Sequence, residues 1–226
     1  MAELTPGKWH RLHQAATEKK TFCILAMDHR GPLRRILQKQ MGENIPDSLL
    51  SEMKINIVRE LSGTYSAVLL DPETGLGPCL EKEALPGRSG LIAALDTGST
   101  GDPQHIHSEL VEGWSIEKIC RLGADGVKLL IYYHPEAKDA GERERLVQNL
   151  GDECRRLDIP FYLEPLCCKK DFSGGSLIST ERRKVIVEMT RRLAPLGVDV
   201  LKLEFPVDIK QQPEEKVWAE ACSEVS

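Results

Sequence analysis

Short runs of consecutive apolar residues recur along the chain, separated by longer segments in which apolar residues return every three or four positions. Such a run is typical of a strand buried on both faces of a parallel sheet. Six runs fit this description: Phe22–Met27, Ser66–Leu70, Leu91–Leu95, Gly126–Ile131, Phe161–Leu163 and Asp199–Phe205. We therefore expect six strands.

The segments between these runs have helical periodicity. Apolar side chains recur at helical spacing in Leu49–Leu61, Leu146–Leu157 and Ile186–Leu193, which predicts amphipathic helices that cover a sheet. Glycine and proline mark helix ends, as at Pro46 and Gly197. Shorter helices are expected at 115–122 and 213–222, and an additional one follows Thr5-Pro6.

Regular alternation of strand and helix predicts a parallel α/β fold. A doubly wound sheet usually has a glycine-rich turn after its first strand, whereas here that turn is Asp28-His29-Arg30-Gly31. We therefore predict a (β/α)8 TIM barrel, of which this sequence contains six βα units and is truncated after the sixth. Residues 1–226 then form a single (β/α) barrel domain that is incomplete at its C-terminus.

Composition narrows the classes of function. A net charge of -5 argues against a nucleic-acid partner. No apolar run approaches the roughly 20 residues of a membrane span, and the segment 9–20 is too polar for a signal peptide. Seven scattered cysteines without a CxxC pair indicate a cytoplasmic protein without a disulfide framework.

Charged residues at the carboxyl ends of the predicted strands are the candidate chemistry, because barrel enzymes carry their reactive groups there. Asp28, Asp71 and Asp96 each follow a strand, and Glu164 closes another. Lys128, Lys202 and Glu204 lie within strands.

Residues two apart in a strand share a face, so we expect Lys202 and Glu204 to point together. A lysine that is buried among apolar neighbours and close to another cation loses its proton more readily. Its free amine can attack a ketone carbonyl, and a nearby carboxyl group can shuttle protons. A buried salt bridge is the alternative interpretation of these pairs. His105 and His107 lack an evident third ligand, so we predict no metal site.

Five segments resemble one known family, the class I tagatose 1,6-bisphosphate aldolases, which include the sulfofructose-phosphate aldolases. They are Ala26–Gly31 (AMDHRG), Leu69–Gly75 (LLDPETG), Gly123–Tyr133 (GADGVKLLIYY), Tyr162–Glu164 (YLE) and Asp199–Val207 (DVLKLEFPV). His29 stands where glutamine is common in the tagatose enzymes, which leaves the exact substrate open.

The resemblance implies a Schiff-base mechanism without metal or organic cofactor. It implies that Lys202 forms the iminium, that Glu164 is its acid/base partner, and that Lys128 and Asp28 complete the catalytic cluster. Arg30 is expected to bind substrate phosphate, since a guanidinium suits that group; Asp71 and Glu204 are further substrate-binding candidates.

The implied reaction splits a ketohexose bisphosphate into dihydroxyacetone phosphate and glyceraldehyde 3-phosphate. The expected partner is thus a small sugar phosphate, with no nucleic acid or membrane and with a homo-oligomer left open. Three alternatives remain. They are a sulfofructose-phosphate aldolase, a non-catalytic truncated barrel that binds a sugar phosphate or a protein, and an isomerase or epimerase with Glu164 as its base.

Overall fold

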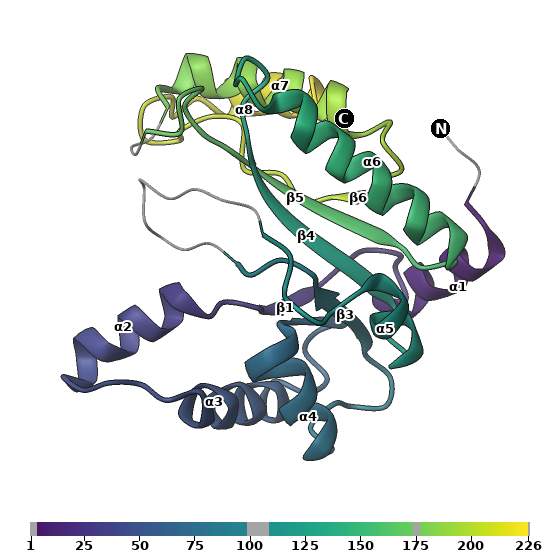
Figure 1. The fold of residues 1–226 in the computed structure, drawn as a ribbon. Coiled ribbons are helices and arrows are strands. Elements are labelled where there is room, and N and C mark those ends of the chain that lie inside the picture. The colour runs from purple at the N-terminus through teal and green to yellow at the C-terminus, as the bar shows by residue number, and fades with distance from the viewer. Residues whose placement is uncertain (1–3, 99–108, 174–176, 226) are drawn as a thin grey trace.

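The computed structural model describes residues 4–98, 109–173 and 177–225. Its strands form one parallel sheet in chain order, as predicted. Figure 1 shows the sheet curled, with α3 and α4 on one flank and α6, α7 and α8 on the other. The strands are β1 (Ile24–Met27), β2 (Ala67–Leu70), β3 (Gly90–Ala94), β4 (Gly126–Tyr133), β5 (Phe161–Cys167) and β6 (Val200–Leu201).

Helices connect each strand to the next. Their bounds are α1 (Pro6–Ala15), α2 (Gly31–Met41), α3 (Asp47–Glu60), η1 (Pro72–Leu76), α4 (Gly77–Glu81), α5 (Ile116–Arg121), α6 (Ala140–Arg156), α7 (Ser179–Leu193) and α8 (Glu215–Ser223). None of the helices described is long and apolar enough to cross a membrane.

Strand alternation divides the buried residues into two cores. The larger core lies between the sheet and its helices, where Leu70, Val127 and Phe161 meet residues of α3, α6 and α7. The smaller one lies on the inner face, around Leu69 and Tyr162. The inner face is therefore apolar toward the start of the strands and leaves their carboxyl ends for polar residues.

Helix α1 packs against the other end of the sheet, where the strands begin. Lys8 Nζ donates to Asp199 Oδ2 at 2.7 Å, and both side chains are almost fully buried. Ser66 Oγ donates to the Ala15 carbonyl at 2.7 Å. These contacts fix α1 beside the first residues of β2 and β6.

Three features differ from the sequence prediction. Helix α2 was not expected; Leu33, Ile36 and Leu37 recur in it at helical spacing, but none of its residues is buried. The glycine- and proline-rich segment after β2, for which no helix was expected, forms η1 and α4. Strand β6 contains only Val200 and Leu201, so Lys202 to Phe205 lie beyond the sheet.

Candidate active site

A cavity of about 280 Å³ lies at the carboxyl ends of β1, β4 and β5, on the inner face of the sheet. This is the end at which barrel enzymes carry their reactive groups. Its lining comprises Asp28, His29, Arg30, Pro32, Gly98, Lys128, Leu130, Glu164 and Leu166.

Lys128 is the centre of this cavity's charge cluster, with a side chain that is only 2% exposed. Its Nζ lies 2.7 Å from Asp28 Oδ2 and 3.0 Å from Glu164 Oε2. Asp96 Oδ2 lies 3.6 Å away on a third side. One buried ammonium is thus enclosed by three carboxylates that come from β1, β3 and β5 or the residues after them.

Glu164 joins the two lysines. Its Oε1 accepts a hydrogen bond from Lys202 Nζ at 2.5 Å, while Oε2 faces Lys128. Leu163 pairs with Leu201 in the register of β5 and β6, so Glu164 and Lys202 stand directly across from each other. Lys128, Glu164 and Lys202 therefore form one chain of contacts, although Lys202 itself does not line the cavity.

The cluster sets the protonation of its members. Burial alone would lower the pKa of Lys128, but the carboxylates of Asp96, Asp28 and Glu164 outweigh it and raise that pKa. Burial would raise the pKa of Asp28, but Lys128 outweighs it and holds this pKa below its usual value. For Asp96 burial dominates, and its pKa is raised.

Arg30 lies at the rim, with a side chain that is 10% exposed. One terminal nitrogen donates to Glu73 Oε2 at 2.7 Å and the other donates to the carbonyl of Asp96. Its Nε is buried and has no hydrogen-bond partner in the part of the chain that the structure describes. The guanidinium therefore keeps one buried N–H without an acceptor among the described residues.

The prediction that Asp71 lines the site is wrong. Its carboxylate is completely buried and paired with Lys54 of α3, and it accepts the Thr74 amide at 2.7 Å. Asp71 caps the first turn of η1, and this local bond draws the side chain out of the strand alternation. Its function in the fold is that of a buried ion pair.

Glu204 also lies away from Lys202. Its carboxylate accepts the Cys167 amide at 2.7 Å and a hydrogen bond from Arg182 of α7 at 2.9 Å. The expected shared face depended on a strand as far as Phe205, but β6 ends at Leu201 and alternation stops there. Lys202 takes Glu164 as its carboxylate instead.

Two further expectations concern lysine and histidine. Lys202 is not buried among apolar neighbours, because its side chain is 50% exposed. Of the two lysines in the cluster, Lys128 is the buried one. His105 and His107 lie outside the described residues. Asp96 was expected at a strand end but was assigned no role in the site, although its position after a buried strand matches that of Asp28.

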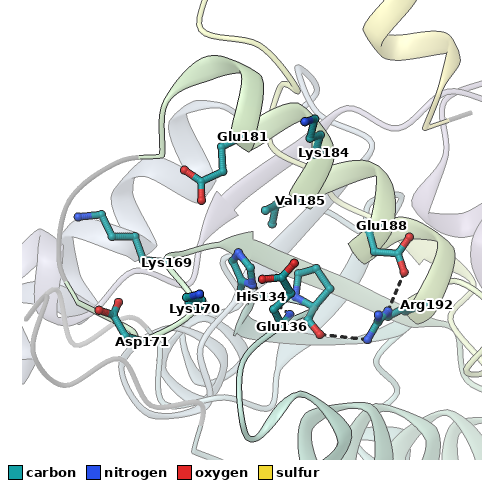
Figure 2. A pocket seen from close by; sticks show the side chains of 11 residues that line it. His134, Glu136, Lys169, Lys170, Asp171, Glu181, Lys184, Val185, Glu188 and Arg192 are labelled. Atoms are coloured by element: carbon teal, nitrogen blue, oxygen red, sulfur yellow. Dashed lines mark hydrogen bonds and ion pairs between the residues drawn. The ribbon is translucent and has the colours of Figure 1, made fainter.

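A larger hollow of about 600 Å³ lies between α7 and the loops after β4 and β5 (Figure 2). Its charges are mixed and partly paired: Arg192 donates to Glu188 at 2.8 Å and to the Pro135 carbonyl at 3.1 Å. None of the residues in the lysine cluster lines it, so size alone does not make this hollow the candidate site.

A curled parallel sheet with covering helices and a polar cluster at the strand ends is the architecture of the (β/α)-barrel enzymes. A family model described as DeoC/LacD family aldolase matches residues 22–224. The chain belongs to this family.

Curated relatives carry a more specific name. The tagatose 1,6-diphosphate aldolase of Streptococcus pneumoniae is 33% identical over 214 residues, which are 92% of this chain and 65% of the relative. That of Listeria monocytogenes is 36% identical over 218 residues, 93% of this chain and 63% of the relative. The chain thus spans slightly less than two thirds of the length of these relatives.

Solved aldolase structures share the fold. The fructose-bisphosphate aldolase from Slackia heliotrinireducens matches with a TM-score of 0.66 at 11% identity, covering 100% of this chain and 70% of that one. An archaeal fructose 1,6-bisphosphate aldolase matches with a TM-score of 0.60 at 17% identity, covering 97% and 76%.

Proposed function

We propose that the chain carries the lysine cluster of a class I aldolase that cleaves a ketohexose bisphosphate such as tagatose 1,6-bisphosphate. The products are dihydroxyacetone phosphate and glyceraldehyde 3-phosphate. The observation that supports this most directly is the contact of Lys202 Nζ with Glu164 Oε1 at 2.5 Å, with Lys128 on the other oxygen. The relatives named tagatose 1,6-diphosphate aldolase support the choice of substrate.

In the proposed reaction, the Lys202 amine attacks the C2 ketone and forms a carbinolamine. Loss of water gives an iminium, which is an electron sink for the bond between C3 and C4. Glu164 accepts the C4 hydroxyl proton as that bond breaks, and the aldehyde leaves. Protonation of the resulting enamine at C3 and hydrolysis return the free lysine and release dihydroxyacetone phosphate.

Lys128 and Asp28 support these steps from behind Glu164. Lys128 stays protonated because carboxylates surround it, and its ammonium lies 3.0 Å from Glu164 Oε2. Asp28 holds the ammonium in place at 2.7 Å. Lys202 lies beyond the residues that line the cavity, and its half-exposed side chain leaves the amine accessible to substrate.

Arg30 is the proposed phosphate ligand of this half of the site. Its Nε has no acceptor among the described residues, and its side chain lines the cavity beside Lys128. A buried guanidinium nitrogen without a partner is costly, and a phosphate oxygen would relieve that cost.

For the whole protein we propose a closed (β/α)8 barrel as a single domain, supported by the curl of the sheet and by the aldolase structures it resembles. The cytoplasm is the proposed compartment, because all seven cysteines are free thiols.

Reductive trapping tests the function. When the full-length protein is mixed with dihydroxyacetone phosphate and sodium borohydride, we expect a secondary amine on Lys202, located by peptide mass spectrometry. Lys202→Ala should abolish both the adduct and cleavage. Lys210→Ala, an exposed lysine in the segment after β6, is the matched control and should leave both unchanged.

Other outcomes separate the alternatives. An adduct on Lys128 would reject the assignment of the nucleophile. Cleavage that persists in Lys202→Ala and is lost with a chelator would indicate a metal-dependent enzyme. Proton exchange at a sugar carbon without any adduct would favour the isomerase or epimerase.

A further inference from the structure

Asp96 stands at the end of β3 with both carboxylate oxygens engaged by backbone amides. The Gly98 amide donates to Oδ1 at 2.9 Å and the Leu130 amide donates to Oδ2 at 2.8 Å. The residue is almost fully buried. A carboxylate that is bonded in this way at both oxygens cannot rotate, so its negative charge has a fixed place between β3 and β4.

The same residue contacts both cations of the cavity. Its Oδ2 lies 3.6 Å from Lys128 Nζ. Its backbone carbonyl accepts a hydrogen bond from the Arg30 guanidinium. The side chain therefore acts on the lysine of the cluster, whereas the main chain acts on the proposed phosphate ligand.

We propose that Asp96 is a positioning residue for the aldolase reaction, whose fixed carboxylate holds the Lys128 ammonium against Asp28 and Glu164. The inference rests on the proposed function and adds a residue to it. Through its carbonyl, Asp96 also keeps Arg30 at a set place relative to that ammonium.

A purely structural role is the competing explanation, because Asp96 links two strands. Asp125 provides the comparison: its Oδ2 accepts the Leu91 amide at 2.9 Å and so links the same two strands, β3 and β4, at their other end. Asp125 does not line the cavity. The two residues share the backbone link, but of the two only Asp96 also lies beside the buried ammonium.

The charged groups around Lys128 make the effect dependent on pH. They are Asp28 with its neighbour His29 after β1, Arg30 at the rim, Asp96 after β3, Glu164 on β5 and, beyond Glu164, Lys202. Burial raises the pKa of Asp96, whereas Lys128 holds that of Asp28 low. As pH falls, Asp96 therefore loses its charge before Asp28 does, and the wild-type protein comes to resemble a variant with a neutral residue at 96.

Steady-state cleavage by Asp96→Asn, Asp125→Asn and the wild-type protein tests this inference. Asp96→Asn should lower kcat by about tenfold to a hundredfold, as expected for a displaced catalytic group. KM should stay within about twofold, because the carbonyl that holds Arg30 is retained. The loss should shrink as pH falls through the pKa of Asp96. Asp125→Asn should lower stability and leave kcat unchanged.

A double-variant cycle checks that Asp96 acts through Lys128. In a Lys128→Met background, Asp96→Asn should cause no additional loss of kcat. Asp96→Ser takes its place if Asp96→Asn does not fold, because the hydroxyl can still accept one amide.

The inference is overturned if Asp96→Asn and Asp125→Asn have the same kcat, if the loss is independent of pH, or if it persists in full without Lys128. A wild-type protein that is not trapped at Lys202 would instead reject the proposed function itself, and the inference with it.

Discussion

Lys128 shows how one buried residue organises a site. A cation with a 2% exposed side chain is costly to bury alone, yet three carboxylates within 3.6 Å compensate it. The same carboxylates depend on the lysine in turn. The cluster is therefore a network in which the removal of one partner leaves the others uncompensated.

The first prediction concerns Lys128→Met and the pH dependence of stability. At neutral pH the variant leaves Asp28 and Asp96 as buried charges without a cation, and the free energy of unfolding should fall by about 3–5 kcal/mol. Because the folded pKa of Lys128 is raised, its stabilisation is fully present below its unfolded pKa and is lost only as pH rises through the folded value.

The lowered pKa of Asp28 determines how the stability deficit of Lys128→Met changes at low pH. In the wild-type protein its contribution is present above the unfolded pKa and is lost as pH falls through the folded value. Without Lys128 this depression disappears and burial favours the protonated acid. Urea unfolding should therefore show a smaller deficit at pH 4.5 than at pH 7.5. Lys184 is exposed, so the control Lys184→Met should show almost no loss of stability at either pH. A Lys128→Met deficit that is equal at the two pH values would contradict this prediction.

At the residue scale, the sequence predicted the members of the lysine cluster better than the two carboxylates expected beside it, Asp71 and Glu204. Position at or near the carboxyl end of a strand identified Lys128, Glu164 and Lys202 as candidates, and their side chains do lie in contact through Glu164. The same reasoning failed for Asp71 and Glu204, because each follows its strand's last paired residue and is held by a local partner, the Thr74 amide or the Cys167 amide. Periodicity has no access to such side-chain bonds to the backbone.

Among the elements, α1 and the polar cluster lie at opposite ends of the sheet. The carboxyl ends of the strands carry the cluster, whereas α1 packs where the strands begin and bonds to Asp199 and Ser66. Gly90, the first residue of β3, allows this approach: a Cβ there would lie 2.6 Å from Ala15 Cα. Backbone atoms cannot move aside as a flexible side chain can, so the glycine is needed for the packing of α1.

The second prediction is that Gly90→Ala destabilises the protein by about 1–3 kcal/mol, the usual cost of overpacking, while the trapped fraction of folded protein stays normal. Thermal unfolding and borohydride trapping measure the two effects. Gly77→Ala is the control, since its Cβ would lie 3.9 Å from the nearest atom. A Gly90→Ala protein as stable as the wild type would show that α1 does not pack closely in solution.

The order of elements was more predictable than their extent. Apolar runs gave all six strands and their parallel order, since each buried strand must be nearly continuous in apolar residues. The runs did not show that β5 continues to Cys167 or that β6 stops at Leu201. The length of a strand depends on how many of its residues pair with the adjacent strand, so it cannot be read from the sequence of that strand alone.

Across the whole molecule, the pairing is uneven. Strands β4 and β5 pair over seven residue positions, from Val127 with Phe161 to Tyr133 with Cys167. Strands β5 and β6 pair over two. The proposed nucleophile thus follows the most weakly paired strand, while its partner Glu164 lies on one of the two most strongly paired strands.

The last prediction is a gradient of hydrogen exchange across the sheet. Amides of β4 and β5 should exchange at least about tenfold more slowly than those near β6, such as the Lys202 amide that bonds to the Leu163 carbonyl at 2.9 Å. Reduction of the adduct with dihydroxyacetone phosphate would tie Lys202 to a ligand that, under the proposed function, occupies the cavity beside Lys128. Exchange near β6 should therefore slow in the adduct, because a ligand that is held only by the folded state makes local unfolding less favourable. Lys202→Ala treated in the same way should show no slowing. Two results would contradict the prediction that bound substrate stabilises β6, the strand that precedes Lys202. One is uniform exchange over all six strands, and the other is slowing in β1 to β5 without slowing near β6.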